Sequence, residues 1–286
     1  MMIVKTKKKT GFSAARLIIF LFLILICLSY LTLIIWAILS SFKSQVEFIK
    51  DKLSLPQKWL FSNYRLAWET LSASGNNAGV MVFNALWLSA GQILIGQSCC
   101  ICFAYVMARF NFPLKSFFNV LNVFIIMVPI IGALPSQMRI ILALGLYDSP
   151  LFLLTAVGGF GAGLVIYRTA FRNVPWEFAE AGYIDGASHV RVFIELMLPQ
   201  VAPLIIAQSI TCFMTVWNDS ITPILYLPSY PTLASGLYVY QIEQERSLHY
   251  PMLFAGCLMC AVPTVLLFIF ARKYMMEINL AGGLKG

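Results

Sequence analysis

A polar segment near the middle of the chain holds residues suited to recognition. Asn173 can cap a helix and Pro175 suits a first helical turn, so the sequence predicts a short helix that begins here. Glu177 and Glu180 fall within this helix, with Glu177 near the positive end of its dipole.

A turn and a second short helix are predicted next. Asp185-Gly186 favours a sharp turn, because glycine adopts a positive φ without steric cost. The stretch from Ser188 to Leu196 is amphipathic, and we expect Pro199 to end it. Its apolar anchors are Val190, Phe193 and Ile194, with Met197 just beyond. Such an element can dock on a protein or lie on lipid headgroups, and the residue types alone leave both open.

A second polar group, Trp217-Asn218-Asp219, lies inside an apolar run. An acid at membrane depth is costly unless it faces protein or a watery cavity. These side chains could therefore bind a polar solute that crosses the membrane, or they could bond to neighbouring helices and fix a bundle.

Other reactive residues give no candidate site. The seven cysteines are Cys27, Cys99, Cys100, Cys102, Cys212, Cys257 and Cys260, and all lie in apolar runs. We expect packing from them, rather than a disulfide, redox or metal site. We also expect no catalytic residue. No phosphate-binding loop of the Gly-x-x-x-x-Gly-Lys-Ser/Thr type occurs, so any ATP must be bound by a partner.

The composition indicates an integral membrane protein. Apolar residues make up 60% of the 286 residues and charged residues only 11%, with a mean hydropathy of +0.82. A soluble domain of this size would be far more polar. The net charge of +8 is explained by membrane topology, so a nucleic-acid partner is not expected.

Six apolar runs are long enough to cross a hydrocarbon core as helices, which predicts an all-α fold with six transmembrane helices. The runs are approximately 17–39, 80–107, 117–144, 151–167, 201–227 and 252–270. Pro129 and Pro135 could break the third run. The glycine cluster 158–163 lies in the fourth, where small residues permit close helix packing.

Basic residues set the orientation. The first run is too long for a cleaved signal peptide and is expected to be retained. Cytoplasmic segments of membrane proteins are enriched in Lys and Arg. If the odd-numbered helices run from the cytoplasm to the outside, thirteen of the twenty Lys and Arg residues lie in cytoplasmic segments. These are Lys5, Lys7, Lys8, Lys9, Arg16, Arg109, Lys115, Arg168, Arg172, Arg191, Arg272, Lys273 and Lys285. Both termini and the segment 173–199 are therefore predicted to be cytoplasmic.

The segment from Glu180 to Pro199 resembles the coupling motif of ABC importer permeases. That motif consists of Glu-Ala-Ala, three residues, Gly, nine residues and Ile-x-Leu-Pro. In this chain Gly182 replaces the second Ala of the motif and Leu196 replaces its Ile. The resemblance implies a cytoplasmic helix-turn-helix between helices four and five that docks in a cleft of an ATPase subunit. The implied coupling residues are Glu180, Ala181, Gly182, Asp185, Gly186, Ala187, Leu198 and Pro199. Glu180 would pair with a polar or basic group in the cleft.

Two further matches resemble the carbohydrate branch of these permeases. The C-terminal sequence looks like its glycine-rich tail, which implies ATPase contacts from Gly282, Gly283, Lys285 and Gly286. The segment 56–64, with its Pro, Trp and Asn-Tyr, resembles the pattern that follows the first helix in sugar importers.

The resemblance also suggests a solute. A Trp-Asn-Asp in the fifth run is similar to the sugar-permease pattern, in which Asn218 and Asp219 would bond hydroxyls and Trp217 would face a sugar ring. We favour a packing role for all three, because a paired permease can supply most substrate contacts. The outer loop 228–250 is expected to be rigid and to contact a solute-binding protein.

The predicted organisation follows from these parts. Residues 1–16 form a basic cytoplasmic terminus, 17–274 the permease domain and 275–286 the cytoplasmic tail. The implied partners are a homologous second permease, an ATPase dimer that holds ATP and Mg, a solute-binding protein and the prokaryotic cytoplasmic membrane. The alternatives are an ABC permease for another polar solute, such as a glycerol phosphate ester, and a secondary transporter.

Overall fold

The computed structural model describes residues 14–128, 132–247 and 249–283. These residues are mostly helical, and one small antiparallel hairpin joins β1 (Ser72–Ala73) to β2 (Asn76–Asn77). The chain forms two compact units, which are described separately. One comprises Met1–Ala67 with Gln244–Leu258, and the other comprises Trp68–Glu243 with Met259–Gly286.

Four helical segments in the described part of the chain are long and apolar enough to cross a membrane. They are Leu17–Ser41, Ala78–Arg109, His189–Trp217 and Tyr250–Phe270. The first belongs to α1 (Ala14–Ser41) and the last to α14 (Tyr250–Gly283). The second joins α4 (Ala78–Gly91), the π-helical turn η1 (Gln92–Gln97) and α5 (Ser98–Arg109). These segments agree with the first, second and sixth predicted runs and with the first part of the fifth.

The third run is broken into two shorter helices. α6 (Lys115–Met127) ends at Val128, whose φ of −84° and ψ of 111° are extended. This is the conformation favoured by a residue that precedes proline. After residues 129–131, which lie outside the described part, α7 (Leu134–Ala143) begins with Pro135 in its first turn.

The fourth run is also interrupted. A 3₁₀ segment, η2 (Pro150–Ala156), precedes α8 (Ala162–Asn173). Gly158, Gly159 and Gly161 of the glycine cluster lie between them, and Gly163 lies in the first turn of α8. Gly161 has a φ of +114°, which a residue with a side chain rarely adopts. A Cβ on Gly159 would lie 2.6 Å from the Phe103 ring. The glycines permit close packing as predicted, but they also break the helix.

The fifth run ends earlier than predicted. Its membrane helix is continuous from α10 (His189–Arg191) through the π-helical turn η3 (Val192–Met197) into α11 (Leu198–Trp217). A separate short helix, α12 (Ile221–Tyr226), follows. The Asp219 Oδ1 atom accepts hydrogen bonds from the backbone N–H groups of Ile221 and Thr222, so this acid starts α12.

The prediction of a loop over 228–250 is wrong for most of its length, because α13 (Leu233–Ser247) is helical. Its start is fixed against α4. The buried Asn84 amide donates to the carbonyl of Pro231 at 3.0 Å. A Cβ on Gly236 would lie 2.3 Å from the Met81 sulfur, so glycine allows this close approach.

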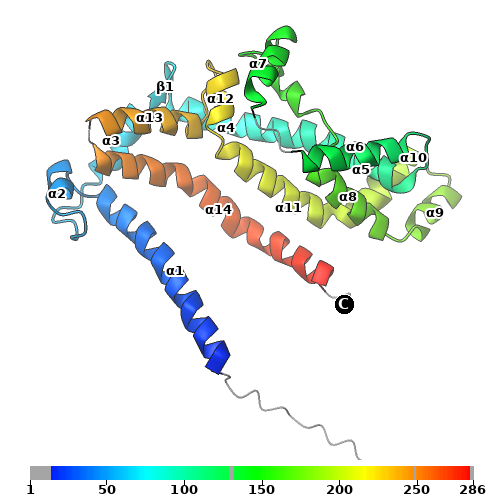
Figure 1. Cartoon of the computed structure of the whole chain (residues 1–286), viewed down its shortest axis with the longest axis horizontal. Helices are drawn as coiled ribbons and strands as arrows, with labels where there is room; N and C mark the ends of the chain where they lie inside the picture. Colours follow the sequence, from blue (N-terminus) through cyan, green and yellow to red (C-terminus); the bar gives the residue numbers. More distant parts are fainter. Residues whose placement is uncertain (1–13, 129–131, 248, 284–286) are drawn as a thin grey trace, which may run out of the picture. The chain divides into compact units, whose positions relative to one another are not determined.

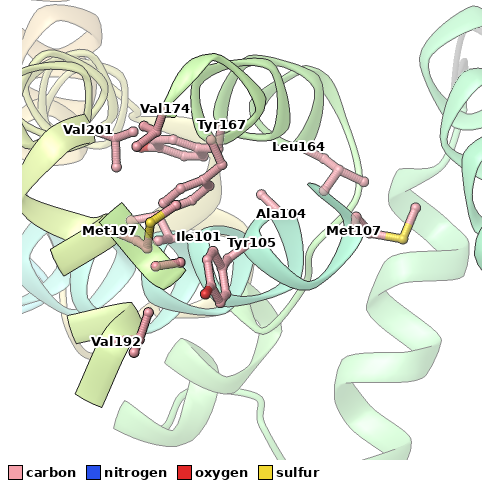
Figure 2. Close-up of a cluster of buried hydrophobic side chains, with 12 residues drawn as sticks. Ile101, Ala104, Tyr105, Met107, Leu164, Tyr167, Val174, Val192, Met197 and Val201 are labelled. Atoms are coloured by element: carbon pink, nitrogen blue, oxygen red, sulfur yellow. The ribbon is translucent and has the colours of Figure 1, made fainter. Parts of the chain in front are cut away.

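The larger unit is organised around α5 and α8, which run side by side (Figure 1). Figure 2 shows their side chains meeting those of η3 and α11 around Ile101 and Ala104. A second buried cluster joins α4, α7, η2 and α12 and includes Leu88, Ile141, Phe152 and Tyr226.

In the smaller unit, the segment that follows α1 folds back on the end of that helix. It contains α2 (Gln45–Lys50) and the start of α3 (Ser62–Thr70). The buried Asn63 amide donates to the carbonyls of Ser41 and Lys43, and the hydroxyls of Tyr64 and Ser41 are 2.7 Å apart. The Asn-Tyr pair noted in the sequence therefore closes the C-terminal end of α1. Buried Lys43 in turn donates to the carbonyl of Asp51 at 3.0 Å.

We expect Asn63→Leu to destabilise the smaller unit. The substitution leaves two buried carbonyls without their donor, which costs about 1–3 kcal/mol for each unpaired group. The thermal unfolding midpoint of the protein purified in detergent should fall by several degrees. Lys58→Ala, at an exposed position in the same segment, is the control. Equal midpoints for the two variants would contradict the role of Asn63.

Candidate functional site

The polar segment forms the predicted helix, turn and helix. Its first helix, α9 (Glu177–Ile184), follows Trp176 rather than an Asn173 cap, because Asn173 is still the last residue of α8. Gly186 has a φ of +79°. Its N–H donates to the carbonyl of Tyr183 at 3.0 Å, and that of Ala187 donates to the carbonyl of Gly182 at 2.9 Å. This is a Schellman motif, which satisfies the last carbonyls of a helix and fixes the direction of the following chain.

The second helix begins at Ser188, whose hydroxyl accepts a hydrogen bond from the Arg191 N–H. Pro199 does not end this helix, as the sequence predicted, but lies exposed in the first turn of α11. The π-helical turn before it changes the hydrogen-bond register, so the missing N–H of proline is tolerated. The next residue toward the N-terminus, Leu198, is half-buried against the main core. The second short helix and the long apolar helix are therefore one continuous helical rod, His189–Trp217.

The two departures from the family motif touch each other. Gly182 is buried, and a Cβ placed on it would lie 2.5 Å from Leu196 Cδ1 and 3.1 Å from Val192 Cγ2. Glycine at 182 thus makes room for the leucine at 196. The pair brings the backbone of α9 directly against the rod that continues into the membrane.

Much of the remaining surface of α9 is open. The exposed residues of the helix are Glu177, Phe178, Glu180, Ala181 and Ile184, and Asp185 directly after it is also exposed. Ile184 is 85% exposed and Phe178 is 45% exposed, so the helix presents two large apolar side chains on its surface. Within the described part of the chain, no side chain pairs with the Glu180 carboxylate. The face combines small, apolar and acidic residues and is suited to a protein cleft.

Aromatic rings connect this element to the bundle. Phe193 of η3 packs on Tyr105 of α5, with ring centroids 4.6 Å apart. Both rings also contact Phe171 of α8, at 6.2 Å and 5.3 Å. The predicted anchor Phe193 therefore points inward, whereas Val190 and Ile194 remain exposed.

Arg109, at the end of α5, fixes the entrance to α9. Its guanidinium donates to the carbonyls of Phe171 and Val174. It also lies over the ring of Trp176, 5.2 Å from the centroid. In the sequence, Arg109 served only as one of the basic residues that indicate membrane orientation. Its partners are backbone atoms 62 and 65 residues away, which no residue pattern reveals.

The polar triplet of the fifth run is divided between two roles. Trp217 is buried and stacks on Phe213, and its Nε1 donates to the carbonyl of Cys260 at 3.5 Å. Asn218 donates to the carbonyl of Met214 at 2.7 Å. Asp219 alone lines a cavity.

The glycine-rich tail is only partly described. Gly282 and Gly283 are the last residues of α14. Lys285 and Gly286 lie outside the described residues.

A family model described as the binding-protein-dependent transport system inner membrane component matches residues 100–274. The probable ABC transporter permease protein YurM of Bacillus subtilis is 28% identical over 289 residues, which cover 99% of this chain and 92% of YurM. The diacetylchitobiose uptake system permease protein NgcG of Streptomyces coelicolor is 29% identical over 84% of this chain and 79% of NgcG. The maltodextrin transport system permease protein MdxG of Bacillus subtilis is 31% identical over 64% of this chain and 66% of MdxG.

A solved structure has the same fold. It is the crystal structure of a bacterial ABC transporter involved in the import of the acidic polysaccharide alginate. One of its chains matches with a TM-score of 0.74 over 90% of this chain and 95% of that chain. The sequence identity is 17%, so the likeness concerns the fold alone.

We expect Gly182→Ala and Leu196→Ala to be strongly non-additive. The added methyl of Gly182→Ala meets Leu196, and this contact should outweigh the gain in helix propensity of about 1 kcal/mol. With Leu196 shortened, the same methyl fills space instead. A double-mutant cycle on thermal stability should give a coupling of about 1 kcal/mol or more. Additive effects would show that the two residues are not in contact.

Proposed function

This chain belongs to the family of binding-protein-dependent transport system inner membrane components, and on that premise we propose that it is one permease subunit of an ATP-driven importer of sugars or oligosaccharides. It is a transport component rather than an enzyme. ATP and Mg would be held by two separate ATPase subunits. A homologous second permease would complete the pathway, and a solute-binding protein would deliver the sugar.

The chain is a multi-pass membrane protein, and we propose six crossings for it. Four are the long apolar segments. The other two would be made by the interrupted runs, α6 with α7 and η2 with α8. Breaks of this kind are tolerated at membrane depth where protein or a watery cavity satisfies the freed backbone groups. The charge distribution supports cytoplasmic positions for both termini, with residues 1–16 and 275–286 as the terminal segments and 173–199 as the coupling segment.

The exposed face of α9 is the observation that carries the coupling role. It offers Glu180, which has no side-chain partner among the described residues, and an almost fully exposed Ile184, on a helix held by a Schellman turn. Glu180 and Ala181 would enter the ATPase cleft, Gly182 and Ala187 would keep the element thin, and Asp185 and Gly186 would form its tip. Leu198 and Pro199 would join it to the membrane rod. Gly282, Gly283, Lys285 and Gly286 would add a second contact.

Transmission would run through contacts of the main core. Closure of the ATPase dimer would push α9, and the Gly182 contact would pass that displacement to the rod His189–Trp217. The ring contacts of Phe193 and the Arg109 hydrogen bonds would carry α5 and α8 with it. Packed side chains transmit strain well because protein interiors are nearly incompressible.

The solute proposal rests on the relatives. Their names assign them diacetylchitobiose, maltodextrin and arabinooligosaccharides. Outside the membrane, the segment around α13 would contact the binding protein. Its anchored start on α4 suits a surface that must keep its shape during docking.

We expect Glu180→Lys to abolish sugar uptake while the permease still enters the membrane. A cation at this position would repel a basic group in the ATPase cleft. Uptake of labelled sugar and co-purification of the ATPase subunits would be measured together. Glu69→Lys makes the same charge reversal on the exposed surface of α3 and should leave uptake intact. Wild-type uptake by Glu180→Lys would contradict the coupling role.

We expect Arg109→Met to uncouple the importer. Methionine cannot donate to the carbonyls of Phe171 and Val174, so α9 would lose its fixed position relative to α5. Uptake should fall about fivefold or more while ATP hydrolysis continues, a factor typical of lost coupling between sites. Arg109→Lys should restore little of the uptake, because a lysine ammonium lacks the planar, forked N–H donors of the guanidinium that reach both carbonyls. Arg172→Met, at an exposed arginine of α8, is the control. Parallel losses of uptake and hydrolysis would argue against transmission through Arg109.

A further inference from the structure

A cavity of about 770 Å³ opens in the larger unit, among α4, α7, η2 and the start of α12. Its size falls in the usual range for small-molecule sites. Part of the second buried cluster forms an apolar wall, which includes the nearly parallel rings of Phe152 and Tyr226 with centroids 5.6 Å apart. The cavity is distant in the chain from the coupling segment and is not used by it.

Polar side chains from four elements converge on this cavity in a chain that is otherwise apolar. They are Gln92, Gln137, Thr155, Asp219, Thr222 and Tyr226. Small-molecule sites combine apolar walls with a few convergent polar groups, so this lining is typical of a binding site.

Much of this hydrogen-bonding capacity is unused. Asp219 uses Oδ1 to cap α12, and its Oδ2 has no hydrogen-bond partner in the described residues. The Gln137 Oε1 atom accepts from the Tyr226 hydroxyl at 3.2 Å, which leaves its amide N–H groups available. The side chains of Gln92 and Thr222 likewise make no hydrogen bond within the described part of the chain. A carboxylate oxygen, amides and a hydroxyl are thus free to bind a ligand.

The backbone around the cavity is irregular in three places. Gln92 starts the π-helical turn η1, Thr155 lies in the 3₁₀ segment η2, and Asp219 lies in the break between α11 and α12. π-helical turns often mark functional sites. Discontinuous membrane helices commonly form the substrate sites of transporters. Three such irregularities around one cavity are explained together by a ligand.

We propose that this cavity binds a neutral sugar unit, so that this chain supplies a substrate site of its own to the importer. The inference rests on the proposed function and specifies its substrate class. Asp219 Oδ2 would accept a sugar hydroxyl, and the amides of Gln92 and Gln137 would donate to others. The wall of Phe152 and Tyr226 would cover the apolar face of the ring. No lysine or arginine lines the cavity within the described residues, and the Asp219 charge repels anions. The lining therefore suits a neutral sugar better than a uronic acid or a phosphate ester.

The test uses the complete importer, with both permeases and the ATPase subunits, in lipid nanodiscs. Equilibrium binding would be measured for three neutral probes, maltotriose, diacetylchitobiose and arabinotriose, and for the anionic trigalacturonate. We expect saturable binding of at least one neutral probe and none of the anion. Asp219→Asn keeps the Oδ1 cap but loses the charge, and it should raise the Kd of that probe about tenfold, the usual effect of one good hydrogen bond to a charged group. Gln92→Met should act similarly.

A pair of threonines provides the control. Thr222→Val removes a hydroxyl from the cavity and should weaken binding. Thr215→Val removes a hydroxyl from the neighbouring helix α11. That hydroxyl donates to the carbonyl of Thr211 and does not line the cavity, so the substitution should have no effect. Absence of neutral-sugar binding, equal binding of trigalacturonate, or unchanged Kd values in all cavity variants would overturn the inference. Those results, obtained with importers that still hydrolyse ATP and transport solute, would leave the proposed function standing. Failure of the wild-type chain to assemble with an ATPase would instead overturn the proposed function.

Discussion

The close contact at Gly182 is the constraint on which the coupling element depends. A helix that receives force is useful only if it cannot slide on the structure that it moves. With no side chain at 182, α9 rests directly on Val192 and Leu196, and those residues belong to a helix that continues into the membrane without a break. The Schellman turn at Gly186 and the hydrogen bonds of Arg109 fix the two ends of α9. Together these contacts make α9, the proposed coupling helix, an extension of the bundle rather than a loop attached to it.

The apolar segments are subject to a different constraint. Where the backbone of a membrane protein is irregular, its N–H and C=O groups must find hydrogen-bond partners within the protein. Each interruption near the cavity has a visible compensation. Asp219 caps α12, Pro135 occupies a helical first turn where no N–H is needed, and the π-helical turns keep long helices continuous. The same interruptions bring polar groups together in an apolar chain.

Much of this arrangement could be predicted from sequence. Apolar run lengths located the four long helical segments, and the motif located the helix-turn-helix with its glycine at positive φ. Other features depend on contacts that no local pattern encodes. Pro199 was expected to end a helix, but the preceding π-helical turn absorbs its missing N–H. The glycines of the fourth run predicted packing, yet Gly161 also breaks the helix. The partners of Arg109 are backbone carbonyls, and the substitutions at 182 and 196 make sense only once they are in contact.

The central claim is that the exposed face of α9 docks on an ATPase subunit in the cytoplasm. The most direct measurement is photo-crosslinking from a benzoylphenylalanine placed at Ile184, which is 85% exposed, or at Leu53, which is 83% exposed in the segment after α1. Position 184 should crosslink to the ATPase subunit and position 53 should not. Crosslinks from 184 to lipid alone, or an ATPase crosslink from 53, would contradict both the coupling role of α9 and the proposed orientation of the chain.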